Sequence, residues 1–129
     1  MADPLTATDA QVADYADNYF EYDSSKRVTK EVAQGAGCSA CAGGFGTFTY
    51  SYTDSGYQPQ GTAIDFNSWQ TVTVETLPDG NRNVVYTNPF GQVMLKVFVD
   101  DATDQEWEEF YAYDADGRTL LMAGPEAVT

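Results

Sequence analysis

The stretch FYAYDADGRTL, residues 110–120, decides the fold. Aromatic and aliphatic residues on either side of a short polar segment are typical of two antiparallel strands. Asp114 stands first and Gly117 fourth in that segment, and the small residues between them suit a type I turn. The glycine supplies the positive φ that a three-residue hairpin loop needs. The stretch therefore predicts a β-hairpin that turns at residues 114–117.

Two more segments have the same turn chemistry. LPDG at 77–80 and NPFG at 88–91 place proline second and glycine fourth. Between the turns, apolar and polar residues alternate with the period of two that half-buried strands show. We expect an all-β protein, in which antiparallel hairpins stack into a curved sheet or a slice of a β-shell. The expected strands are 47–52, 71–76, 83–87, 92–99, 107–113 and 118–122. Val93 to Val99 is apolar on both faces except for Lys96, which predicts a central strand covered on both sides.

The composition excludes several functional classes. The 129 residues fit one domain, and 20 acids against six Lys and Arg give a net charge of −14. Six scattered cations cannot form a nucleic-acid interface, and an anionic membrane surface would repel the chain. The absence of histidine excludes Ser-His-Asp catalysis and His-ligated zinc. No apolar run approaches the roughly 20 residues of a membrane span. No spacing singles out a pair of catalytic carboxylates, so we expect neither an enzyme nor a cofactor.

A repeat runs through the chain. Residues 22–28 (YDSSKRV), 86–93 (YTNPFGQV) and 113–120 (YDADGRTL) share a tyrosine, a turn-forming polar residue, a short turn, often Gly, often Arg, and then an aliphatic residue. A lone hairpin cannot bury its apolar face, so such units are expected to stack side by side. The residues that carry the repeat are Tyr22, Asp23, Arg27, Tyr86, Gly91, Tyr113, Asp114, Gly117 and Arg118.

These residues resemble the YD repeat of Rhs-type proteins. The match is close over residues 110–118 and good over 19–23 with Arg27, although Lys26 stands where the family has glycine. A lysine there would adopt positive φ at a cost of about 1 kcal/mol or more. The resemblance spans residues 19 to about 123. It implies a non-catalytic slice of the hollow β-shell that these large exported or cell-surface proteins build. The expected localisation is secreted or cell surface, in a bacterium.

The expected domain organisation follows from the repeat. Residues 1–18 are an acidic lead-in, either a loop or a short helix capped by Thr8. Residues 19–123 form the YD-repeat β module, which contains a glycine-rich loop at 35–46. Residues 124–129 are a linker to the next unit. The expected partners are neighbouring repeats of the parent chain, with an enclosed cargo or a surface glycan as further possibilities.

Both cysteines, Cys38 and Cys41, lie in the glycine-rich loop. A local disulfide in an exported protein is the favoured interpretation, and a metal site, a redox dithiol and free thiols are the alternatives. Lys96 is interpreted as an edge-strand residue that blocks strand pairing, with an isopeptide crosslink as the alternative. The turn at 114–117 has two aspartates that turn chemistry explains without calcium. The acidic block at 100–109 is expected to face solvent.

Two functional hypotheses come from different classes. The first is the structural repeat module. The second is an adhesive or glycan-binding surface module that uses exposed aromatic and acidic side chains. In either case an isolated slice would expose unpaired strand edges. Because salt screens the repulsion between acidic chains but does not weaken apolar burial, we expect self-association to grow with salt.

Overall fold

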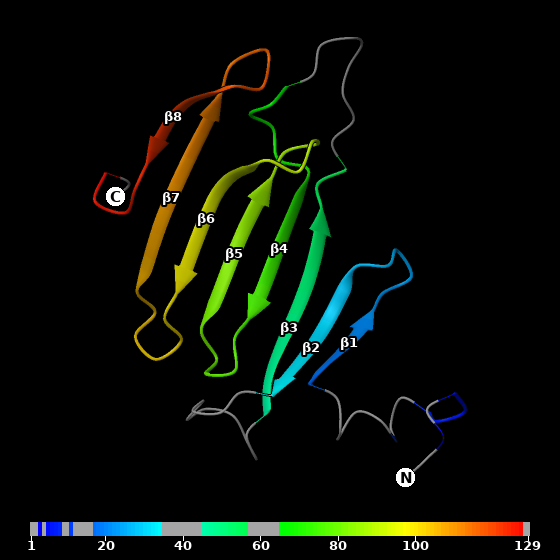
Figure 1. Cartoon of the computed structure of the whole chain (residues 1–129). Helices are drawn as coiled ribbons and strands as arrows, with labels where there is room; N and C mark the ends of the chain where they lie inside the picture. The colour runs from blue at the N-terminus through cyan, green and yellow to red at the C-terminus, as the bar shows by residue number, and fades with distance from the viewer. Residues whose placement is uncertain are drawn as a thin grey trace.

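The computed structural model describes residues 3, 5–8, 11, 17–34, 45–56 and 65–127, and within these ranges the chain is all-β. In this part of the chain one antiparallel sheet contains eight strands in sequence order, each paired with its neighbours in the chain (Figure 1). Among the described residues the sheet is open, with β1 and β8 as its two edge strands. The strands are β1 (Asn18–Tyr22), β2 (Val28–Gln34), β3 (Phe45–Asp54), β4 (Thr71–Thr76), β5 (Arg82–Thr87), β6 (Val93–Val99), β7 (Glu106–Tyr113) and β8 (Thr119–Ala123).

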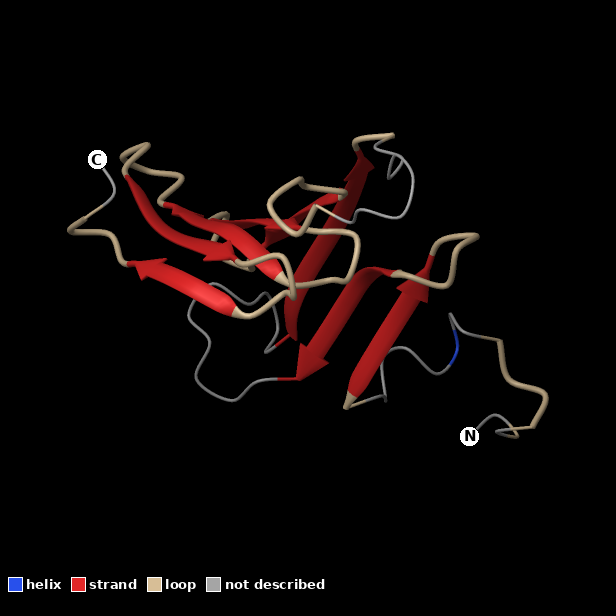
Figure 2. Cartoon of the chain, turned by 90° about the horizontal axis from the view of Figure 1, so that it is seen from above, coloured by secondary structure: helices blue, strands red, loops and turns tan. Residues whose placement is uncertain are grey.

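The sheet is twisted, so β1 and β2 lie at a clear angle to the later strands when seen from above (Figure 2). Such a twist is the usual consequence of right-handed strand geometry. In the described part of the chain, no helix is long and apolar enough to cross a membrane.

The alternation of side chains gives the sheet two different faces. Directly paired residues share a face, so the pairs Val74↔Val84 and Val84↔Val97 define an aliphatic surface, here called the valine face. Tyr50, Thr73, Glu75, Asn83, Val85 and Lys96 lie on the opposite surface, here called the recess face. Among the described residues, the buried hydrophobic side chains are only Val97, Val99 and Tyr113.

The prediction that residues 93–99 are covered on both sides is wrong. Val97 and Val99 of β6 are buried on the valine face, but Lys96 is exposed on the recess face. The interpretation of Lys96 as an edge residue is also wrong, because β6 lies between β5 and β7. Antiparallel sheets commonly pack one face and leave the other accessible, and the exposed Lys96 marks the accessible face of this strand.

The turns have the geometry that their sequences predict. Gly80, Gly91 and Gly117 adopt positive φ of 91°, 78° and 78°. Lys26 occupies the same place in the first turn with a φ of 63°. In each turn the fourth residue donates its backbone N–H to the carbonyl of the first, for example from Gly117 to Asp114 at 3.0 Å. Each loop therefore reverses the chain by the same backbone path.

The strand register shows which positions of the repeat are equivalent. Tyr22 pairs with Val28 and Tyr113 with Thr119, each beside a shift of register. In the middle copy the corresponding pair is Thr87 with Val93. Thr87, and not Tyr86, therefore occupies the place of Tyr22 and Tyr113. An alignment of the three copies on Tyr86 is shifted by one residue, because Thr87 stands between Tyr86 and the first turn residue, Asn88.

Other parts of the expected organisation are only partly described. Thr8 and Gln11 are joined as a helix cap would require: the Thr8 N–H donates to Gln11 Oε1 at 2.9 Å. Most of the helix expected after Thr8 lies outside the described residues. The expected loop at 35–46 ends earlier than predicted, because β3 begins at Phe45. After β8 the chain makes a turn at 124–127, where Ala127 N–H donates to the Gly124 carbonyl at 2.9 Å.

Candidate functional site

The repeat residues form separate capped turns at one end of the sheet. In the last hairpin, Asp114 Oδ1 accepts the backbone N–H groups of Asp116 and Arg118, both at 2.9 Å. The other carboxylate oxygen accepts the Arg118 Nε–H at 2.8 Å. In the first hairpin, Asp23 makes the same three contacts, to Ser25 and to the backbone and Nε of Arg27, each at 2.9 Å. These bonds, led by the arginine backbone N–H, lower the pKa of both aspartates.

The middle hairpin has an uncharged version of this cap. Asn88 Oδ1 accepts the backbone N–H groups of Phe90 and Gln92 at 3.0 Å, and Asn88 Nδ2 donates to Gln92 Oε1 at 2.9 Å. Asn88 is only 2% exposed, and it is the largest fully buried side chain among the described residues. A buried charge is costly without a partner, so an Asn–Gln pair replaces the Asp–Arg pair here.

Residues from the connection between β3 and β4 pack onto this buried cap. The Phe66 ring stacks on Phe90 with ring centroids 4.8 Å apart. The Phe66 carbonyl accepts Asn88 Nδ2–H at 3.0 Å. Gln92 Nε2 also donates to the Gly117 carbonyl at 3.0 Å, which joins the middle turn to the last one. The middle turn is therefore held from both sides.

A tyrosine hydroxyl joins each of two hairpins, β1–β2 and β5–β6, to the strand that follows it. Tyr52 of β3 donates to the carbonyl of Val28 at 2.7 Å, and Tyr113 of β7 donates to the carbonyl of Val93. Val28 and Val93 occupy the same position, as the first residue of the return strand after the turn. We call each such contact a tyrosine clamp. Tyr86 has a different role, with its ring edge-on to Trp69 at 5.7 Å.

Arg27 shows what the next strand adds to a charged cap. Its guanidinium lies over the Tyr52 ring, 4.5 Å from the centroid, and 3.6 Å from Asp54 Oδ2. The neighbouring aspartates and the tyrosine raise the pKa of Arg27. Its side chain is 36% exposed, whereas that of Arg118, which has no following strand in the described chain, is 75% exposed.

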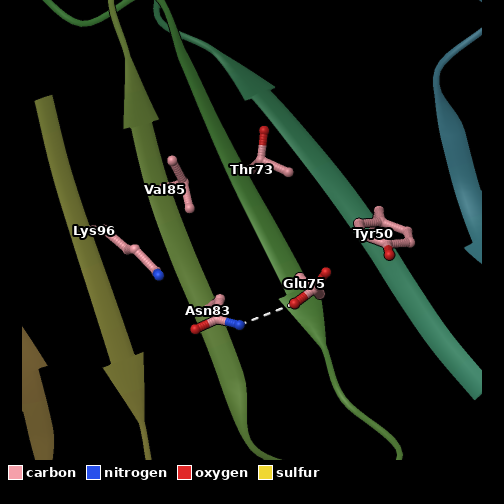
Figure 3. A pocket seen from close by; sticks show the side chains of 6 residues that line it. All are labelled: Tyr50, Thr73, Glu75, Asn83, Val85 and Lys96. Atoms are coloured by element: carbon pink, nitrogen blue, oxygen red, sulfur yellow. Dashed lines mark hydrogen bonds between the residues drawn. The ribbon is translucent and has the colours of Figure 1, made fainter. Parts of the chain in front are cut away.

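A shallow recess of about 380 Å³ lies on the recess face, over β3 to β6 (Figure 3). The small side chains of Thr73 and Val85 form its middle, and Tyr50 and Lys96 stand on either side (Figure 3). Glu75 accepts the Asn83 Nδ2–H at 2.9 Å at its lower end. The recess thus combines an aromatic ring, a carboxylate, an amide and an ammonium group.

The Tyr50 hydroxyl stays protonated at neutral pH. Burial, followed by the negative charges of Glu75 and Glu31, raises the pKa of Tyr50 to about 12. Tyr50 donates to Glu31 Oε2 at 3.4 Å. A neutral phenol beside two carboxylates is suited to hydrogen bonding, and its pKa is far from that of a general base at neutral pH.

The predicted disulfide pair, Cys38 and Cys41, lies outside the described residues. Within the described ranges, no group of three or more Cys, Asp or Glu side chains is placed to hold a metal ion. The acidic loop between β6 and β7 is held by its own first residue, because Asp100 Oδ1 accepts the N–H groups of Ala102 and Thr103 at 2.9 and 3.2 Å.

Sequence reasoning missed the residues that tie the turns together. Phe66 and Asn67 lie outside every expected strand, Gln92 is the first residue of the strand expected at 92–99, and their contacts reach across 22 to 46 residues. No periodic pattern marks such residues. The sequence carries one signal for such contacts. At the middle turn Asn88 and Gln92 stand at the positions where the other two turns have Asp and Arg, and uncharged residues at these positions indicate burial.

Comparison with known proteins gives no assignment. The chain matches no family model, no curated protein and no solved structure.

Proposed function

We propose that this chain is a non-catalytic structural repeat module of a large exported or cell-surface bacterial protein. Its role is to form part of a curved β-sheet or shell that encloses or presents other segments. The single observation that carries the proposal is the recurrence of one joint: a capped turn whose return strand accepts a tyrosine hydroxyl from the next strand, at Val28 and at Val93. A joint that recurs along a sheet is a means of adding strands in series.

The sparse core supports the same proposal. A single sheet leaves both faces partly accessible, and stable isolated sheets usually pack against another layer. Ten large hydrophobic side chains of the described chain are exposed, and five of them lie on the two outermost strands: Phe20, Tyr22, Leu120, Leu121 and Met122. These side chains are placed where neighbouring repeats of a parent chain would cover them. The acidic composition with only three Lys supports an exported location.

The proposal is tested with a tandem fusion of two copies. If the module is a repeat, the fused copies unfold together, at a higher midpoint temperature than the single copy, because stacking neighbours adds interface stability. Amide hydrogen exchange in β8 of the first copy is then slower than in the single chain. Two copies that unfold independently, at the temperature of the single chain, would contradict the proposal.

A second candidate, a glycan-binding surface module, is favoured by the recess. Sugars are bound by aromatic rings together with carboxylate and amide groups, and Tyr50, Glu75 and Asn83 supply these groups from one row of paired positions across β3, β4 and β5. Titration with a panel of simple sugars, followed by amide NMR shifts, tests this candidate. Saturable shifts confined to the recess residues would support glycan binding, and their loss in Tyr50→Ala would place the sugar there. Unchanged spectra across the panel would exclude this role.

A further inference from the structure

We propose that the free edge of β8 is the docking site for strand β1 of another copy of this module, joined head to tail. In this arrangement the Tyr22 hydroxyl of the incoming copy forms a tyrosine clamp on the Thr119 carbonyl, and its ring covers Arg118. The inference rests on the proposed repeat function and deepens it, because it names the partner strand and its register.

The two interior joints supply the template for this contact. At β2 the return strand begins with Val28 and receives Tyr52 from β3. At β6 the return strand begins with Val93 and receives Tyr113 from β7. Thr119 begins the third return strand, β8, after the same capped turn. Within the described chain no tyrosine reaches Thr119, because β8 is the last strand of the sheet.

The charged cap before β8 is complete except for its cover. Arg118 binds Asp114 at 2.8 Å and Asp116 at 3.0 Å, yet its side chain is 75% exposed. Arg27, with an equivalent aspartate partner, is 36% exposed because Tyr52 and Asp54 of the next strand lie against it. The difference between the two arginines corresponds to one missing strand that carries a tyrosine.

Strand β1 has the features of that strand. It ends in Tyr22 directly before the turn residue Asp23, as β7 ends in Tyr113 directly before Asp114. Tyr22 is 59% exposed, and its hydroxyl makes no hydrogen bond within the described residues. β1 lies at the other edge of the sheet and runs antiparallel to β8, since every neighbouring pair between them is antiparallel. A second copy in the same orientation therefore continues the ladder.

The register follows from the interior joints. Lys30 lies two residues after Val28 and pairs with Thr49, which lies three residues before Tyr52. Leu95 pairs with Phe110 by the same count from Val93 and Tyr113. Applied to Thr119 and Tyr22, this count pairs Leu121 with Tyr19 of the incoming copy. Leu120 is then opposite Phe20, so two exposed apolar side chains cover one another.

Charge sets the condition under which the contact forms. Residues 119–123 of β8 carry no charge, but the net charge of −14 repels whole copies from one another. Salt screens that long-range repulsion and leaves contact burial nearly intact. The association is therefore expected to be stronger at about 500 mM salt than at about 20 mM salt.

Two blocked variants test the head-to-tail geometry. Leu120→Glu/Met122→Glu closes the β8 edge, and Phe20→Glu closes the β1 edge; all three side chains are exposed, so circular dichroism is expected to remain that of a folded sheet. By sedimentation at high salt, wild type forms a series of oligomers, each variant alone is monomeric, and an equal mixture forms a 1:1 dimer. A monomeric wild type, or a variant that oligomerises like wild type, would overturn the inference.

The clamp itself is tested by removing one hydroxyl. Tyr22→Phe is expected to weaken association about 2- to 10-fold, as for the loss of one net hydrogen bond. Tyr86→Phe, on the interior strand β5 and away from both edges of the sheet, is the matched control and leaves association unchanged. Equal affinity of Tyr22→Phe and wild type would overturn the clamp. The tandem fusion separates the two proposals: cooperative unfolding that Tyr22→Phe in the second copy does not alter would keep the repeat function and reject this docking.

Discussion

The side chain of Asn67 pairs with both backbone groups of Tyr113, 46 residues further along the chain. Asn67 Nδ2 donates to the Tyr113 carbonyl at 2.9 Å, and Asn67 Oδ1 accepts the Tyr113 N–H at 2.9 Å. One side-chain amide thus replaces a strand partner at the end of β7, where Tyr113 is buried. The connection between β3 and β4 is thereby tied to the last hairpin, three strands away.

The first prediction concerns this tie. Asn67→Ala leaves the N–H and carbonyl of a buried residue without their partner, so we expect the free energy of unfolding to fall by about 1–3 kcal/mol. Urea denaturation measures the loss. Asn18→Ala, on the exposed edge strand β1, is the control and is expected to change stability little. Equal stability of the two variants would show that Asn67 does not hold the connection.

The second prediction separates two glycines with the same φ. A Cβ on Gly117 would lie 2.6 Å from Cε1 of Phe66, whereas a Cβ on Gly91 would meet nothing within 4 Å. Gly91→Ala therefore suffers only the strain of positive φ, about 1 kcal/mol. Gly117→Ala suffers the same strain and also displaces Phe66 from its stack on Phe90, so its thermal midpoint is expected to fall further. Equal midpoints would contradict the contact between Phe66 and the last turn.

The turns were predictable because their signals are local. Asp114 and Gly117 act within five residues, and the hydrogen bonds that they satisfy lie in the same short segment. The strands between the turns followed from alternation, so that β4 was predicted with the bounds Thr71–Thr76 that the structure has. Local patterns of this kind do not depend on the rest of the chain.

The contacts between turns were not predictable from local patterns. The pairing of Asn67 with Tyr113 and the stacking of Phe66 on Phe90 depend on how the sheet brings separate hairpins together. The sequence alignment also misplaced Tyr86, because a gap of one residue is invisible without the register. Thr87 holds the position of the repeat tyrosine, and only the pairing with Val93 reveals it.

The third prediction exchanges the charged and uncharged caps. In the wild type, the Phe66 carbonyl and Gln92 Oε1 accept hydrogen bonds from Asn88 Nδ2. Asn88→Asp places a carboxylate against these two acceptors, at a site that is 2% exposed. An unpaired buried charge costs about 3 kcal/mol or more, so we expect a large loss of stability in urea. Because protonation would neutralise the new carboxyl group, the loss should shrink as the pH falls.

The reverse exchange is the control. Asp114→Asn keeps an Oδ1 acceptor for the N–H groups of Asp116 and Arg118, as Asn88 does in the middle turn. The turn is partly exposed, so we expect the thermal midpoint to fall much less than in Asn88→Asp. If both exchanges destabilise the protein equally, burial does not explain the choice of Asn and Gln in the middle turn.

The last prediction concerns acid stability. Asp23 and Asp114 have a pKa below the ordinary value of 3.8, chiefly because each carboxylate accepts the backbone N–H of its arginine. A depressed pKa in the folded state adds stability that is present above the unfolded pKa and is lost as the pH falls through the folded pKa. In Asp23→Asn/Asp114→Asn neither site titrates, but both keep an acceptor oxygen. We therefore expect the thermal midpoint of the double variant to fall less than that of wild type between about pH 5 and about pH 2. Asp17→Asn, outside the turns, removes one carboxylate as the control and should follow the wild-type curve. If the double variant also follows that curve, the two turn aspartates contribute nothing to the pH dependence.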